Sequence, residues 1–216
     1  MSQLEYLIAL VSIIVGLGLT DLARSLRELV RPGRTVHWHW LPLVWAAIVF
    51  LLVLNVWWQA FRFLRDDALA HVAAFAPVLL AFLLFYLLCA FALPDPAWAV
   101  GRTTESDGTG AEAGGRNGVL DLEVFYFSRP HRRWFFGTFI GLLVSSQLFN
   151  LAKWAMQGEA VLTTAHLVQN AGLNVGIAVV LGGLIATDRR WVHGGITLLV
   201  VGIVGYTLLT GVPTIG

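Results

Sequence analysis

The segment from Arg132 to Gln157 most constrains what this chain can fold into. It contains no acidic or basic residue between Arg133 and Lys153. Because a helix rises about 1.5 Å per residue, about twenty such residues cross the roughly 30 Å hydrocarbon core of a bilayer. Of the 216 residues, 57% are hydrophobic and 12% are charged, whereas soluble domains carry about 25% charged residues. We therefore expect an integral membrane protein.

Five other apolar runs are also long enough to cross a bilayer. Together they predict one all-α domain over residues 1–216, a bundle of six transmembrane helices with spans at about 4–20, 41–61, 72–93, 134–155, 166–186 and 191–210. Tryptophans near the span ends fit the aromatic belts of a membrane. Residues 101–118 are rich in Gly, Ser, Thr and acids, which predicts a flexible loop. The aromatic residues 121–127 are expected to fold back under the bundle before the fourth span.

The residues after the first span have two faces. Leucines and a valine occupy one face of 21–31, and Arg24, Arg27 and Arg31 occupy the other. This pattern predicts a short amphipathic interfacial helix that contacts anionic lipid through these arginines and ends at Pro32-Gly33. A continuation of the first helix explains the pattern equally well.

The basic residues predict the orientation. Eleven of the fourteen lie in the loops after the first, third and fifth spans. By the positive-inside rule these loops, including 101–118, are cytoplasmic and both termini are periplasmic. Thirteen of the fourteen are Arg, a bias typical of GC-rich bacterial genomes, so we expect a multi-pass protein of the bacterial inner membrane. A net charge of +1 without a basic face indicates no nucleic-acid partner.

Polar residues inside the spans concentrate toward the outer leaflet on three helices. The candidate polar cluster comprises Asn55, Gln59, Ser146, Gln147, Asn150, Lys153, His166, Asn170 and Asn174. Two explanations stay open: hydrogen bonds between packed helices, or an outward-opening cavity for a small polar solute or ion. No Asp or Glu lies mid-span, which disfavours an ion-coupled pump.

Small residues recur at four-residue spacing and predict close helix packing. The candidate packing residues are Gly137, Gly141, Ser145, Gly172, Gly176 and Gly182. The same surfaces suit a membrane-protein partner or a homo-oligomer.

Histidines raise a further hypothesis, a haem-bearing redox subunit, for which His71 and His166 share a leaflet. The other four, His37, His39, His131 and His193, are expected at the cytoplasmic surface, where they match no metal-ligand spacing. We assign no metal and no cofactor.

Serine chemistry is not indicated either. Ser145 or Ser146 with His166 would be the candidates for a protease, but nothing marks either serine as a nucleophile. We assign no catalytic residue.

Three stretches resemble small multi-pass bacterial inner-membrane proteins that carry no assigned activity. They are the opening LEYLIALVSIIVGLGLTDLARSL, the WLPLVWA of Trp40–Ala46 and the HRRWFFG of His131–Gly137. The resemblance implies a membrane protein and transfers no functional residue. The leading hypothesis is a protein that handles a small polar solute or ion, and the alternatives are a non-catalytic scaffold or partner subunit and the haem-bearing subunit.

Overall fold

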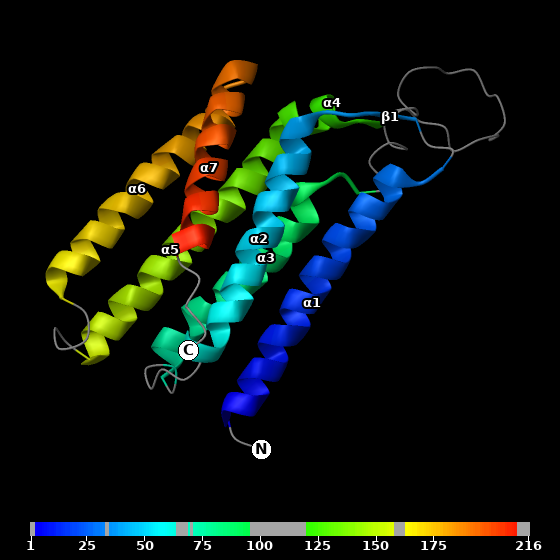
Figure 1. Ribbon diagram of the computed structural model, residues 1–216. Helices are drawn as coiled ribbons and strands as arrows, with labels where there is room; N and C mark the ends of the chain where they lie inside the picture. The colour runs from blue at the N-terminus through cyan, green and yellow to red at the C-terminus, as the bar shows by residue number, and fades with distance from the viewer. Residues whose placement is uncertain are drawn as a thin grey trace.

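The computed structural model describes residues 3–32, 35–63, 69, 71–95, 120–157 and 163–210. Within these ranges the protein is all-helical apart from one short strand pair (Figure 1). The helices are α1 (Gln3–Val30), α2 (Trp40–Phe63), α3 (Val72–Ala92), α4 (Leu122–Phe127), α5 (Arg129–Gln157), α6 (Thr164–Ala186) and α7 (Arg190–Thr210). The strands are β1 (Val36–His37) and β2 (Leu120–Asp121), which pair in parallel.

Five of these helices, α1, α2, α3, α5 and α6, are long and apolar enough to cross a membrane. The apolar stretch of α7 is shorter, Arg190–Tyr206. Many large apolar side chains on the outside of the bundle are exposed, as lipid-facing positions of a membrane protein are. The architecture is therefore that of a transmembrane helical protein. The flexible loop expected at 101–118 lies outside the described residues.

The separate interfacial helix expected after the first span is wrong. Helix α1 continues without a break to Val30, so the alternative of one extended helix is correct. The physical reason is that residues 21–30 contain no Pro or Gly and many good helix formers. Leu22, Ser25 and Leu29 are buried on one stripe of this extension, so that face packs against protein rather than lipid.

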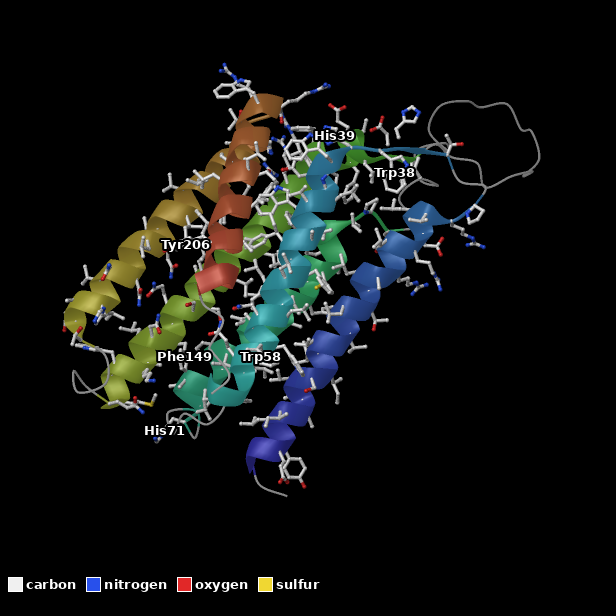
Figure 2. All side chains as sticks on the ribbon, viewed as in Figure 1. Trp38, His39, Trp58, His71, Phe149 and Tyr206 are labelled. Carbon is white, nitrogen blue, oxygen red and sulfur yellow. The ribbon has the colours of Figure 1, made fainter. Side chains whose placement is uncertain are left out.

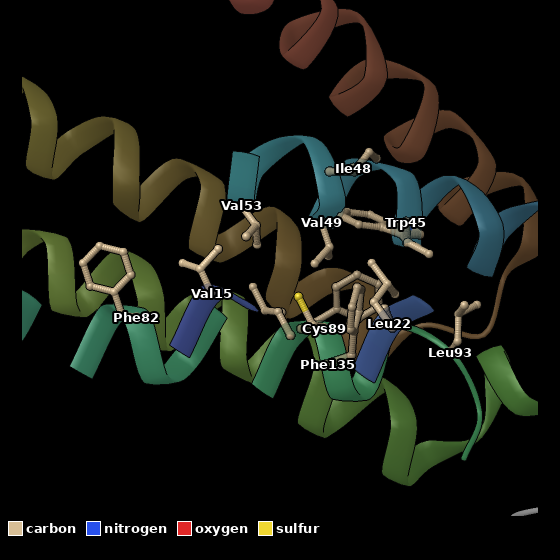
Figure 3. Close-up of a cluster of buried hydrophobic side chains, with 14 of the residues drawn as sticks. Val15, Leu22, Trp45, Ile48, Val49, Val53, Phe82, Cys89, Leu93 and Phe135 are labelled. Atoms are coloured by element: carbon tan, nitrogen blue, oxygen red, sulfur yellow. The ribbon is translucent and has the colours of Figure 1, made fainter. Parts of the chain in front are cut away.

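The core lies where α3 meets α1, α2 and α5 (Figure 3). Trp45 of α2 is buried at its centre, edge-on to Phe135, Phe136 and Phe139 of α5 with ring centroids 5.2–5.7 Å apart. Around this core, α6 packs mainly on α5, and α7 packs mainly on α2. The bundle therefore depends on α3 and α5, and α6 and α7 are peripheral.

The segment 121–127, expected to fold back under the bundle, forms α4. The Asp121 carboxylate accepts hydrogen bonds from the backbone N–H groups of Glu123 and Val124 at 2.9 and 3.0 Å, an N-cap that starts the helix. Helix α4 contacts α2 and α5 and buries Tyr126 completely.

The six long helices alternate in direction, so their connections gather at two ends (Figure 1). One end collects the last turns of α1, α3 and α6 and the first turns of α2, α5 and α7. We call it the arginine-rich end, because the described arginines that lie there are Arg24, Arg27, Arg31, Arg129, Arg132, Arg133, Arg189 and Arg190. Trp38 and His39 lie at this end, and His71 and Phe149 lie toward the other, which we call the opposite end (Figure 2).

Candidate functional site

At the opposite end, a cavity of about 500 Å³ lies between α2, α3 and α5. Most of its lining is apolar, and the polar side chains are Gln59, Ser145 and Ser146. The Ser145 hydroxyl donates a hydrogen bond to the Pro77 carbonyl of α3. Gln59 donates to the Asn55 side-chain oxygen at 2.5 Å on the same helix. Gln59 and Ser145 thus have protein partners, and Ser146 makes no hydrogen bond with a described residue.

A different face of α5 carries a second set of polar residues. Gln147, Asn150, Trp154 and Gln157 are spaced three, four and three residues apart, so they form one stripe on the helix, and all four are half-buried. Three of their polar atoms are buried without a hydrogen-bond partner in the described part of the chain: Gln147 Nε2, Trp154 Nε1 and Gln157 Oε1. We call these four residues the α5 polar stripe.

Helix α6 supplies Asn174 at the depth of Gln147. Gln147 lies ten residues before the last residue of α5, and Asn174 lies ten residues after the first residue of α6. Because the two helices are antiparallel and pack together, the equal rise puts both amides about 15 Å from the connection. Asn174 is half-buried, whereas His166, Gln169 and Asn170 are exposed.

The structure therefore divides the candidate polar cluster. Gln59 and Ser146 line the cavity between α2, α3 and α5, and Asn55 lies beside Gln59. Gln147 and Asn150 lie on the α5 polar stripe, Asn174 lies at the depth of Gln147 on α6, and Lys153 is also half-buried. His166 and Asn170 point away from the protein. Trp154 and Gln157 were missed by the sequence reasoning, although Trp154 lies four residues after Asn150 and Gln157 lies seven residues after it, which is a usable helical signal.

The candidate packing glycines differ from one another. A Cβ added at Gly141 would lie 3.4 Å from the Leu84 side chain, so α3 approaches α5 closely there. At Gly137, Gly172, Gly176 and Gly182 an added Cβ would meet no described atom within 4 Å. Close approach of helices within one chain is thus seen at Gly141, and also at Gly18, which faces Tyr86 and Cys89.

At the arginine-rich end the expectation that His131 and His193 lie at the surface is wrong. Both are buried in aromatic surroundings, His131 stacked on Phe135 at 5.2 Å between ring centroids and His193 edge-on to Tyr126 at 5.4 Å. The reason is that α4 folds over the first turns of α5 and α7 and covers them. His37 is exposed near Asp121, as expected for a surface residue.

His193 joins three segments through hydrogen bonds. Its Nε2 lies 3.0 Å from the Thr187 carbonyl, and its Nδ1 lies 3.0 Å from the Tyr126 hydroxyl. A carbonyl only accepts, so Nε2 carries the proton, and in the neutral ring Nδ1 accepts from Tyr126. Burial raises the pKa of Tyr126, which keeps its hydroxyl protonated and able to donate.

Arg132 completes this arrangement. Its buried guanidinium donates to the Thr187 carbonyl and forms an ion pair with Asp188, which is exposed. We call Tyr126, His193, Thr187, Arg132 and Asp188 the Tyr126–His193 network. Arg132 Nε has no partner among the described residues.

Two further contacts reinforce the network. Trp45 Nε1 donates to Thr197 Oγ1 at 3.0 Å, joining α2 to α7. Arg190 of α7 lies 2.6 Å from the Glu123 carboxylate of α4. No sequence signal pointed to these two contacts, because the two residues of each pair lie 152 and 67 positions apart in the chain.

Neither end holds a metal-ligand cluster: within the described residues, no three His, Cys, Asp or Glu side chains lie together. His71 and His166, the pair considered for haem, are both exposed at the opposite end. Searches of known protein families, curated proteins and solved structures found no match to this chain.

Proposed function

We propose that this chain is a multi-pass inner-membrane protein whose six long helices each cross the bilayer, with both termini periplasmic. Two observations support this topology. The arginines gather at one end of the bundle, and the apolar part of α7 lies beside the spanning helix α2. A thiol introduced by Ser106→Cys, in a Cys89→Ala background, should then react with reagent only from the cytosolic side.

Within that topology, we propose that the protein binds and conducts a small uncharged polar solute along the α5 polar stripe. The observation that carries this proposal is the set of three buried polar atoms on the stripe without partners. In a bilayer no bulk water reaches such atoms, and leaving one unsatisfied costs about 1–3 kcal/mol. A guest that hydrogen-bonds all three would recover this free energy.

The chemistry of the stripe selects the class of solute. Gln147 Nε2 and Trp154 Nε1 are donors, and Gln157 Oε1 is an acceptor, so all three atoms are uncharged. They match a molecule with both hydroxyl or amide donors and acceptors, such as a small polyol or amide. Asn174 adds one more donor and acceptor at the depth of Gln147.

The test is solute entry into proteoliposomes. We expect vesicles containing the wild-type protein to take up glycerol or urea faster than protein-free vesicles, measured by stopped-flow light scattering. Gln147→Leu and Asn174→Leu should lower the rate toward the protein-free baseline, because the first removes a hydrogen-bonding group from the stripe and the second removes one from α6 at the same depth. Gln169→Leu is the matched control, since this glutamine is exposed on α6 outside the stripe.

The opposite outcome would favour the scaffold alternative. If wild-type vesicles are no faster than protein-free ones for either solute, and Gln147→Leu only changes stability, the stripe is a packing surface for another helix. A uniform effect of all three variants, control included, would also count against the proposal.

A further inference from the structure

A second cavity, independent of the α5 polar stripe, lies at the arginine-rich end. It has a volume of about 570 Å³ and lies between the extension of α1, the end of α3 and the start of α5. Asp21, Arg24 and Ser25 line it from α1, and Phe91 and Trp134 line it from α3 and α5. The extension of α1, which was expected to lie on the membrane surface, thus forms one wall of a cavity.

Three charged side chains line this cavity, Asp21, Arg24 and Asp95, and the first two have opposite signs and no partner among the described residues. Asp21 and Arg24 lie one helical turn apart, and neither makes a hydrogen bond or an ion pair with the part of the chain that the structure describes. Their neighbours do form ion pairs: Arg27 and Arg31 both reach Glu28 at 3.4 Å. Asp21 is half-buried, and removing a carboxylate from water is unfavourable unless a cation or a donor compensates.

The aromatic residues that line the cavity are of the kind expected at the depth of lipid headgroups. Phe91 is the second-last residue of α3, and Trp134 lies in the second turn of α5 and is 66% exposed. The centroids of the Phe91 and Trp134 rings are 6.3 Å apart. Exposed tryptophans at helix ends mark the boundary between hydrocarbon and headgroups, and aromatic faces attract ammonium groups.

We propose that this cavity binds the phosphoethanolamine headgroup of a membrane phospholipid. The phosphate pairs with the Arg24 guanidinium, and the primary ammonium pairs with the Asp21 carboxylate beside the aromatic rings. A glycerol headgroup has no cation for Asp21. A choline headgroup has a cation but no N–H to donate. The two acyl chains then extend along the apolar surface of the bundle.

Native mass spectrometry of the full chain, released from detergent with equal amounts of phosphatidylethanolamine, phosphatidylglycerol and phosphatidylcholine, tests the proposal. We expect one retained phosphatidylethanolamine, preferred over the other two by about ten-fold, the factor expected from one charge-assisted hydrogen bond. Asp21→Asn should abolish the preference over phosphatidylglycerol. Arg24→Gln should weaken binding of both lipids by a similar factor.

Two further variants keep the test decisive. Arg27→Gln is the matched control, because Arg27 lies on the same helix but outside the cavity, and it should leave the preference unchanged. Ala90→Phe keeps both charges and fills the cavity from α3, so it should prevent retention if the lipid binds there. Equal retention of the three lipids by the wild type, or retention by Ala90→Phe, would overturn the proposal. If soluble phosphoethanolamine displaces the retained lipid, the ligand is the free headgroup rather than the phospholipid, and the proposal is overturned.

Discussion

Helix α5 carries buried polar groups at both ends of the bundle, and the two sets differ in how far the described part of the chain satisfies them. In its first turn, Arg132 is tied to Thr187 and Asp188. In its second half, Gln147, Trp154 and Gln157 each bury a polar atom that no described residue meets. One helix therefore holds a largely paired network at the arginine-rich end, where Arg132 Nε still lacks a described partner, and three buried polar atoms without described partners in its second half.

This difference predicts separate roles for the two ends. A buried polar group that finds its partner within the chain rigidifies the fold, whereas one without a partner favours binding of another molecule. The packing of the neighbouring helices explains the contrast. Helix α4 and the first half of α7 cover the buried groups at the arginine-rich end. Helices α6 and α7 make few contacts with each other. Stability should therefore depend on the first set and ligand binding on the second.

The largest effect is expected from Arg132→Leu. It removes the guanidinium that ties α5 to the connection between α6 and α7, and we expect a loss of about 2–4 kcal/mol of unfolding free energy. Thermal unfolding in detergent measures it. Arg133→Leu is the control, since Arg133 is exposed, and equal losses for both variants would refute the importance of the network.

A smaller loss is expected from Tyr126→Phe, which leaves His193 Nδ1 buried without its donor. We expect about 1–2 kcal/mol. Tyr6→Phe, at a tyrosine that is 62% exposed, should have no measurable effect. Thermal unfolding of both variants, compared with the wild type, gives the two values.

The pH dependence of the same variant gives a second readout. Burial raises the pKa of Tyr126, so the folded state holds its proton more tightly than the unfolded state does. The stabilisation is therefore complete below the ordinary tyrosine pKa of about 10 and declines as the pH rises above it. Tyr126→Phe should lose less stability than the wild type over that alkaline range.

The smallest effect, of opposite sign, is expected from Gln147→Leu. Because Gln147 Nε2 has no partner to lose in the described chain, replacing the amide should leave stability unchanged or raise it by up to about 1 kcal/mol. Gln59→Leu breaks the hydrogen bond to Asn55 and should be neutral or slightly destabilising. A large loss for Gln147→Leu would mean that this end is also a paired core.

Much of the helical framework could be predicted from the sequence. The uncharged interval between Arg133 and Lys153 already specified a spanning helix, because hydrocarbon excludes charges whatever the neighbours are. The extension of α1 to Val30 could not be decided, since Leu22 and Leu29 would face lipid headgroups or protein with the same pattern. Only the packing of the other helices against the face with Leu22 and Leu29 shows that this face contacts protein and not lipid.

The polar sites were predictable only in part. Gln147, Asn150 and Asn174 were found because residues three or four apart share a helix face, which is a local property. The burial of Tyr126, Arg132 and His193 was not, because it depends on where α4 folds over α5 and α7.

By itself, the amino-acid sequence determined that this chain is a membrane protein and where most of its long helices lie, because the hydrophobic length and the placement of charge are properties of each segment alone. The tertiary structure decided which polar groups meet a partner and which do not. That outcome depends on distances between segments up to 152 residues apart, as between Trp45 and Thr197, and no local pattern encodes them.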